Sequence, residues 1–289
     1  MFEGNAAADS AGNRALERWK SLPVAAIPSD PQRPLSIWLG DPVSIKDPTA
    51  AVLARHPAAN LLILGQAIEP AQNLLGAALV ALAAQRAFPA NAAPSDPAGG
   101  GVWILEATAA DALGAAESMP RLAELAGSLE LPHTAIGRRE LPDRFRALAA
   151  EVERRAAGAI DDAPPLVLMI HNLARFRDLR RDENDMGFSF SADPAKTSPD
   201  KDFLKILREG PSFGVHTLVW CDTLANLLRS VERSALREFD MRVLFQMNPG
   251  DSSQMVDGPA ASKLGRHFAL YSHEESGTLE KFRPYAWPT

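Results

Sequence analysis

Residues 65–72 join an apolar run to a helix-forming stretch, and such a junction is where an α/β protein can bind a phosphate. Phosphate binding there needs free backbone N–H groups and a compensating cation. Pro70 lacks an N–H, and Glu69 brings a negative charge that can itself satisfy the helix dipole, by about 0.3–1 kcal/mol. We therefore expect no ordinary phosphate site. The segment reads Gly65, Gln66, Ala67, Ile68, Glu69, Pro70, Ala71 and Gln72.

A second polar pair, His171 and Asn172, follows the apolar run 166–170, at the carboxyl end of a predicted strand. Ligands bind to α/β sheets at such ends. However, Mg²⁺ prefers hard oxygen ligands to imidazole, and an amide cannot act as a general base. We expect His171 to be a hydrogen-bonded imidazole at the sheet edge, with contact to a ligand or partner as the alternative.

The densest basic run lies just beyond this pair, at residues 175–181. Its arginines could contact DNA phosphates, and its aromatic ring could stack on a base. Acidic residues follow directly, so a solvated surface is the simpler interpretation. Contact with nucleic acid or a protein partner is kept as a candidate role for Arg175, Phe176, Arg177, Arg180 and Arg181.

The remaining reactive residue types give no catalytic or metal constellation. The six histidines lack H-x-x-x-H or a comparable ligand spacing, so we expect no metal site. His216 lies in an apolar run and is predicted to be a satisfied core residue. The single cysteine, Cys221, excludes disulfides and is expected to be packed rather than reactive. Ser212 sits in a literal G-x-S-x-G, but a helix precedes it and a strand follows, the reverse of a hydrolase elbow.

The composition is that of an ordinary globular protein: 289 residues, 46% hydrophobic, 23% charged, with a net charge of −6. The acidic balance excludes a dedicated basic nucleic-acid tail. No apolar run is long enough to span a bilayer, and the first residues do not form a signal peptide. We expect a cytoplasmic protein.

Apolar strands alternate with amphipathic helices, which predicts a mostly parallel sheet covered on both faces. A leader and proline-rich linker occupies residues 1–34, and one domain occupies 35–289; the chain looks like a module of a longer polypeptide. Strands are predicted at 35–39, 43–45, 60–64, 102–105, 166–170, 215–220 and 242–247, and a hairpin at 268–271 and 279–282. Helices are predicted at 13–22, 70–88, 112–126, 142–157, 203–209 and 224–239.

In this order the elements resemble the motor domain of FtsK/SpoIIIE-type ATPases, in the HerA–FtsK group of P-loop translocases, over residues 35–284. That family has a phosphate loop G-x-x-x-x-G-K-[ST] and a later strand ending in Asp-Glu. Here Gly65 matches, whereas Pro70, Ala71 and Gln72 stand at the second Gly, Lys and Ser/Thr positions. His171-Asn172 stands at the Asp-Glu position. Three later segments also match the family's order: residues 213–219, 242–253 and 263–266.

The resemblance implies a RecA-like P-loop NTPase fold with a C-terminal β-hairpin. With both motifs degenerate, we expect a catalytically inactive pseudo-ATPase module without a cofactor or catalytic residues. It would act in ring assembly, partner docking or regulation of an active motor domain. Its partners would be proteins or other domains of the same polypeptide, including a homo-oligomeric ring, with DNA reached only through the full-length protein. One alternative is a divergent DNA translocase that binds ATP and Mg²⁺ through nonstandard residues. Another is an unrelated α/β ligand-binding domain.

Overall fold

The parallel half of the sheet is built from the apolar runs predicted as buried strands, together with one edge strand at residues 133–135 that was not predicted. Its order is β8-β3-β7-β6-β4-β5, and neighbouring strands are all parallel. Both faces are covered, which explains why these strands are continuously apolar rather than alternating. The strands are β3 (Leu61–Leu64), β4 (Gly101–Glu106), β5 (His133–Ala135), β6 (Leu166–His171), β7 (Val215–Cys221) and β8 (Met241–Leu244).

The antiparallel half extends the same sheet from β8, giving the order β2-β1-β10-β9-β8 and ten strands in the described part of the chain. The predicted C-terminal hairpin is confirmed as β9 (Ala269–His273) and β10 (Thr278–Pro284). Strand β9 pairs with β8, with Met241 opposite His273. The outer strands are β1 (Leu35–Pro42) and β2 (Thr49–Leu53).

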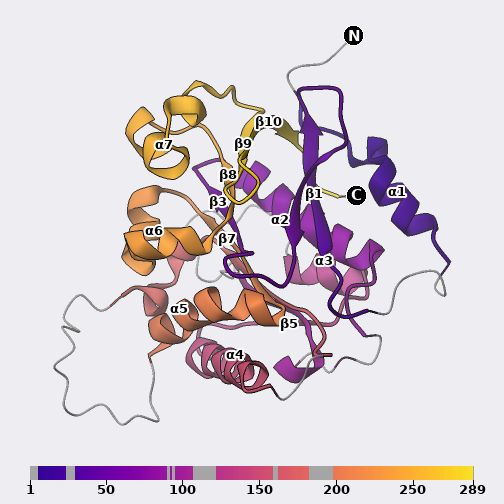
Figure 1. Cartoon of the computed structure of the whole chain (residues 1–289), viewed down its shortest axis with the longest axis vertical. Coiled ribbons are helices and arrows are strands. Elements are labelled where there is room, and N and C mark those ends of the chain that lie inside the picture. The colour runs from indigo at the N-terminus through magenta and orange to yellow at the C-terminus, as the bar shows by residue number, and fades with distance from the viewer. Residues whose placement is uncertain are drawn as a thin grey trace.

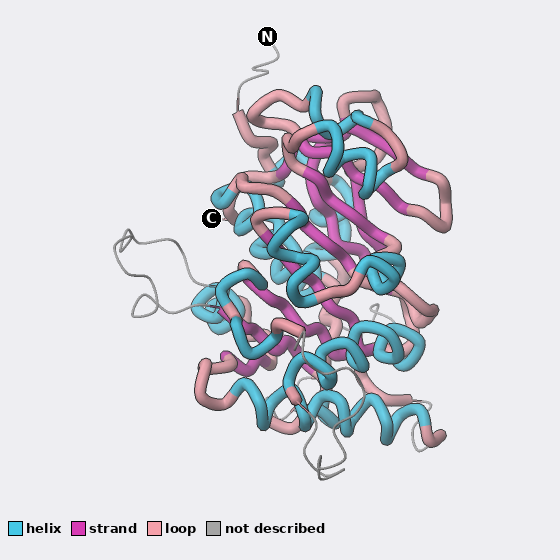
Figure 2. Tube along the Cα trace, turned by 90° about the vertical axis from the view of Figure 1, so that its left-hand side faces the viewer, coloured by secondary structure: helices cyan, strands magenta, loops and turns pink. Residues whose placement is uncertain are grey.

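Helices cover both faces of the sheet (Figures 1 and 2), and each face has its own hydrophobic cluster. One face carries α1 (Arg14–Ser21), α2 (Ile68–Ala84) and α3 (Leu122–Ser128). The other carries α4 (Leu141–Ala156), α5 (Pro199–Glu209), α6 (Leu224–Ser230) and α7 (Pro249–Val256). This computed structural model describes residues 6–23, 30–89, 92, 95–106, 122–158, 162–181 and 198–288.

Several predicted elements differ in the structure. The strand expected at 43–45 is a bend, with Val43 64% and Ile45 108% exposed, because β1 continues to Pro42 and then turns toward β2. The helix expected at 224–239 ends at Ser230 and is followed by a short 3₁₀ helix, Arg233–Glu238. Strands β2 and β5 and helix α7 were not predicted. The first part of the helix expected at 112–126 lies outside the described residues.

Candidate functional site

The loop between β3 and α2 is short. Strand β3 ends at Leu64 and the helix begins at Ile68, so residues 65–67 form the whole connection. The Gly65 N–H donates to the carbonyl of Cys221 at 3.0 Å. Gly65 has φ +133°, and a Cβ there would lie 2.8 Å from the Cβ of Phe245, so this position requires glycine. The start of the loop is therefore held against the neighbouring strand ends.

The start of α2 places its residues differently from a phosphate-binding loop. Pro70 lies in the first turn, and the Ala71 N–H already donates to the Ala67 carbonyl at 3.0 Å. The Ala71 side chain is fully buried in the core, whereas Glu69 is exposed. A side chain at position 71 therefore faces the hydrophobic cluster and not the edge of the sheet.

Trp220, near the end of β7, fills the space beside this loop. Its indole Nε1 donates to the Gly65 carbonyl at 3.0 Å, and its ring centroid lies 4.8 Å from that of His171. The side chain is 1% exposed. Because β7 lies between β3 and β6 in the sheet, the indole lies between the two segments that the sequence singled out. The two segments are thus brought to one edge, and a buried aromatic ring separates them.

His171 is a neutral group in this setting. Burial, and secondly the charge of Arg175, lower the pKa of His171 to about 4. Within the described part of the chain, its Nε2 has no hydrogen-bond partner, so the expected hydrogen-bonded imidazole is wrong for this nitrogen. Asn172 adopts φ +63° and begins a 3₁₀ turn. An uncharged, desolvated imidazole cannot balance the charge of a phosphate.

A cavity of about 210 Å³ lies on the other side of the loop. It contains two carboxylates, Asp222 and Asp251, and no Lys, Arg or His among the described residues that line it. Each carboxylate accepts an amide hydrogen bond, from Asn226 at 2.8 Å and from Asn248 at 2.7 Å. Two acidic groups without a cation disfavour an anionic ligand.

A second cavity, of about 530 Å³, lies at the N-terminal end of α2. Its lining combines Glu69 and Pro70 with the aromatic rings of Phe245 and Tyr285. Arg266 and His267 also line it, so it contains the basic side chains that the smaller cavity lacks.

The basic run divides into buried and exposed members. Phe176 is 3% exposed and packs in the core, so its ring cannot stack on a base, and the expected surface contact is wrong for this residue. Arg180 donates to the carbonyl of Ala174 and Arg181 to that of Leu228, each at 3.0 Å. Arg175 and Arg177 are exposed. The neighbouring residues 186–190, considered as a pore or partner loop, lie outside the described residues.

Other sequence predictions can be placed directly. His216 is buried and its Nδ1 lies 2.9 Å from the carbonyl of Ala59, which confirms a satisfied core residue. Burial raises the pKa of the Cys221 thiol to about 12, in agreement with a packed, unreactive cysteine. Ser212 lies in a 3₁₀ turn (Gly210–Phe213) before β7, which confirms that the elbow geometry is absent there.

Sequence reasoning missed Trp220, although a signal was present. Side chains alternate along β7, so Leu218 and Trp220 share the face that packs on α2. Trp220 is the last bulky residue on the face of β7 that packs on α2, and β7 lies between the strands that carry Gly65 and His171. A residue of this size at this position predicts that the space between those two segments is filled.

The sheet order and its flanking helices give this chain the fold of the P-loop ATPases. Three solved structures share it. The cytoplasmic domain of the type VII secretion ATPase EccC from Thermomonospora curvata has a TM-score of 0.59 and 17% identity, over 97% of this chain and 32% of that one. The cytoplasmic domain of EssC gives 0.57 and 15%, over 87% and 43%. The pCW3 conjugation coupling protein TcpA, as a monomer with ATPγS, gives 0.56 and 10%, over 93% and 72%.

These structures show similarity to FtsK/SpoIIIE-type ATPases at the level of the fold. The chain spans about a third of the EccC domain and less than half of the EssC domain. No protein-family model matches the sequence, and no curated protein matches it. Among the described residues, no helix is both long and apolar enough to cross a membrane.

Proposed function

We propose that this chain is a nucleotide-independent pseudo-ATPase module of a larger, multi-domain FtsK-like protein. It acts through its shape, by ring assembly, by docking a protein partner or by regulating an active motor domain of the same polypeptide. The full protein would work in the cytoplasm, and DNA would be reached only through it. The similarity to single portions of EssC and EccC supports a modular role.

The observation that carries this proposal is the position of Trp220. Its indole occupies the space between the Gly65 loop and His171, bonded to the first and packed against the second. Phosphates and Mg²⁺ would need that space together with a ring of N–H donors and hard oxygen ligands. The short loop, the neutral imidazole and the acidic cavity all disfavour an anion at the same edge.

A second candidate function rests on the larger cavity beside α2. Arg266 and His267 could hold a nucleotide by nonstandard contacts, as a divergent ATP-dependent DNA translocase would require. Glu69, on the same lining, opposes it by charge repulsion. The alternative of an unrelated α/β ligand-binding domain is not favoured, because the fold matches P-loop ATPases.

Titration with ATPγS or ADP in the presence of Mg²⁺, followed by thermal unfolding, tests both candidates. We expect no change in the unfolding midpoint. A nucleotide at 100 times its Kd would add about 2.7 kcal/mol to the free energy of unfolding, and such a shift would contradict the proposal. Loss of the shift in an Arg266→Ala variant would then assign binding to the larger cavity.

The double variant Pro70→Gly, Ala71→Lys restores the missing residue types and serves as a matched control. We expect it to gain no nucleotide affinity and to lose several kcal/mol of stability, because position 71 is fully buried and the lysine charge would be desolvated. Recovery of Mg²⁺-nucleotide binding would show that only those two losses silence the site.

Arg175 and Arg177 are exposed residues of the basic run and are proposed partner contacts. If the contact is with a polyanion, the double variant to Ala lowers affinity and reduces its salt dependence. A protein partner would give a weaker dependence on salt.

A further inference from the structure

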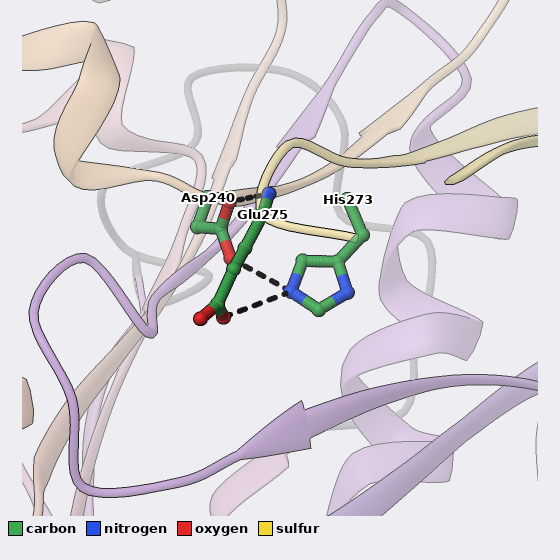
Figure 3. Close-up of side chains that lie close together, drawn as sticks. All are labelled: Asp240, His273 and Glu275. Carbon is green, nitrogen blue, oxygen red and sulfur yellow. Dashed lines mark hydrogen bonds and ion pairs between the residues drawn. The ribbon is translucent and has the colours of Figure 1, made fainter. Parts of the chain in front are cut away.

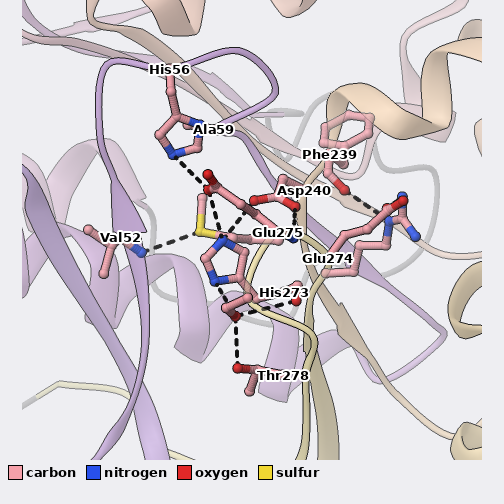
Figure 4. A network of polar contacts seen from close by, with 12 residues as sticks. Val52, His56, Ala59, Phe239, Asp240, His273, Glu274, Glu275 and Thr278 are labelled. Atoms are coloured by element: carbon pink, nitrogen blue, oxygen red, sulfur yellow. Dashed lines mark hydrogen bonds and ion pairs between the residues drawn. The ribbon is translucent and has the colours of Figure 1, made fainter.

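A mixed cluster of imidazoles and carboxylates lies at the opposite, amino-terminal edge of the parallel strands. Asp240 directly precedes β8, His273 ends β9, and Glu275 lies in the β9–β10 turn (Figure 3). Their ligand-type atoms all lie within 4.8 Å of one another. A second imidazole, His56, reaches the cluster from the loop before β3 (Figure 4).

The spacing of these atoms suits a small divalent ion. His273 Nε2 lies 2.7 Å from Asp240 Oδ2 and 4.0 Å from Glu275 Oε2, and His56 Nε2 lies 3.7 Å from the same Glu275 oxygen. Four donors around Zn²⁺ at about 2.0–2.1 Å would be separated by about 3.3 Å. The separations that join His273 to Asp240 and to Glu275 bracket that value, whereas His56 contacts only Glu275.

The buried carboxylate points one oxygen into the cluster, toward His273. Asp240 is 6% exposed; its Oδ1 accepts the Glu275 N–H at 2.8 Å. Its Oδ2, despite the short approach of His273, has no partner with hydrogen-bond geometry in the described part of the chain. A buried oxygen of this kind is costly unless a cation satisfies it.

Both imidazoles are held with Nε2 toward the carboxylates. His56 Nδ1 lies 2.9 Å from the carbonyl of Pro57, and His273 Nδ1 lies 3.0 Å from Ser276 Oγ. In metal sites the second ring nitrogen of a histidine ligand makes a bond of this type, which fixes the tautomer and the ring orientation.

We propose that Asp240, His273 and Glu275 form a binding site for a divalent transition-metal ion of the Zn²⁺ class, with His56 beside it as a contact of Glu275. Two carboxylates balance a charge of +2, and the mixed N/O donor set favours Zn²⁺ over Mg²⁺ or Ca²⁺. The ion would join the start of β8 to the end of β9 and the β9–β10 turn. It therefore fastens the antiparallel half of the sheet to the parallel half.

Calorimetric titration of the tag-free, chelator-stripped chain with Zn²⁺, in buffer containing excess Mg²⁺, tests the site. We expect one equivalent to bind at micromolar concentration. Co²⁺ should give the visible absorption of a four-coordinate ion with the same stoichiometry. Absence of Zn²⁺ binding would overturn the proposal.

Variants assign the binding to these residues. Asp240→Asn keeps the oxygen that accepts from the Glu275 N–H and replaces the oxygen that faces His273, so we expect the fold to be retained. Glu275→Gln changes a side chain that is 67% exposed. Each, like His273→Ala, should weaken Zn²⁺ binding by about 100-fold, and His56→Ala by about tenfold.

His133→Gln is the matched control, because His133 lies on β5, away from the cluster, and should not change the affinity. Equal affinity in the native chain and in Asp240→Asn and Glu275→Gln would show adventitious binding to surface histidines and would overturn the proposal.

Discussion

The two ends of the parallel strands differ in how their polar groups are satisfied. At the carboxyl end, where α/β sheets usually bind ligands, Trp220 closes the gap between Gly65 and His171. At the amino end, Asp240 and His273 face each other as an ion pair beside Glu275. Trp220 therefore fills the space between the two segments at the carboxyl end, whereas the opposite end gathers imidazoles and carboxylates that pair with one another.

The difference between the two ends shows that a fold does not by itself determine where a functional site lies. A parallel sheet places its strand ends together whether or not they carry chemistry, so a shared fold does not by itself show a shared site. At the carboxyl edge, the Trp220 indole packs between the Gly65 loop and His171. At the amino edge, the residue before β8 meets the end of β9 and the β9–β10 turn. They meet because β9 pairs antiparallel with β8, and β10 pairs with β9.

The largest loss of stability is expected when the Trp220 side chain is removed from the carboxyl end of the strands. Trp220→Ala removes a fully packed indole and should lower the free energy of unfolding by about 3–5 kcal/mol, as measured by urea denaturation. Trp220→Phe keeps a ring but loses the bond to the Gly65 carbonyl, and should cost only about 1–3 kcal/mol. Neither variant should bind nucleotide, because neither adds a cation. If the free energy of unfolding fell by less than about 1 kcal/mol in Trp220→Ala, the packing of the indole would not stabilise this end of the sheet.

The order of strands and helices could be predicted because each buried strand is a continuous apolar run, such as 166–170 in β6. The predictions failed for β2 and β5, where the sequences Thr49–Leu53 and His133–Ala135 are short or only half-buried. Their pairing depends on the neighbouring strand more than on their own composition.

The two edges were not equally predictable. Residues 65–72 and His171 follow strands directly, so the sequence placed them at one edge, but it did not show that a third strand separates them. The opposite cluster combines positions 56, 240, 273 and 275, and only the last two are close in the sequence. Ligand spacing in the sequence carries no signal when the donors come from three different connections.

Removal of Zn²⁺ should lower the free energy of unfolding through the cluster at the amino edge, and this loss should not depend on residues at the carboxyl edge. With Zn²⁺ at 100 times its Kd, the free energy of unfolding should exceed that of the chelator-treated chain by about 2.7 kcal/mol. The increment should vanish in Asp240→Asn and persist in Trp220→Phe. An equal increment in both variants would place the ion elsewhere.

Lowering the pH should reduce the free energy of unfolding through His171, at the carboxyl end of β6. Its pKa in the folded chain, about 4, lies below the value of 6.5 for a free imidazole, so the unfolded state binds more protons between these values. The free energy of unfolding should therefore fall as the pH drops from about 6.5 to 4, by an amount on the order of 2 kcal/mol from this residue. His216, with a pKa also lowered to about 4 by burial, contributes in the same direction.

Replacing His171 by Phe isolates this contribution. The variant keeps an aromatic ring against Trp220 and should show a smaller loss of stability between pH 6.5 and 4 in urea denaturation. His133→Gln should retain the full loss. Parallel curves for native protein and His171→Phe would show that His171 titrates normally.

The smallest change in stability is expected at Glu69, an exposed residue at the start of α2. Glu69 lies in the first turn of α2, where its carboxylate complements the N-terminal end of the helix dipole. Glu69→Gln should lower the free energy of unfolding by about 0.3–1 kcal/mol at low salt. The difference should shrink at 1 M NaCl, because exposed charges are then screened. If Glu69→Gln instead gained affinity for inorganic phosphate, the carboxylate alone would be keeping an anion site empty. Loss of stability without phosphate binding would instead show that the acid serves the helix, and that the packing around Trp220 closes the edge.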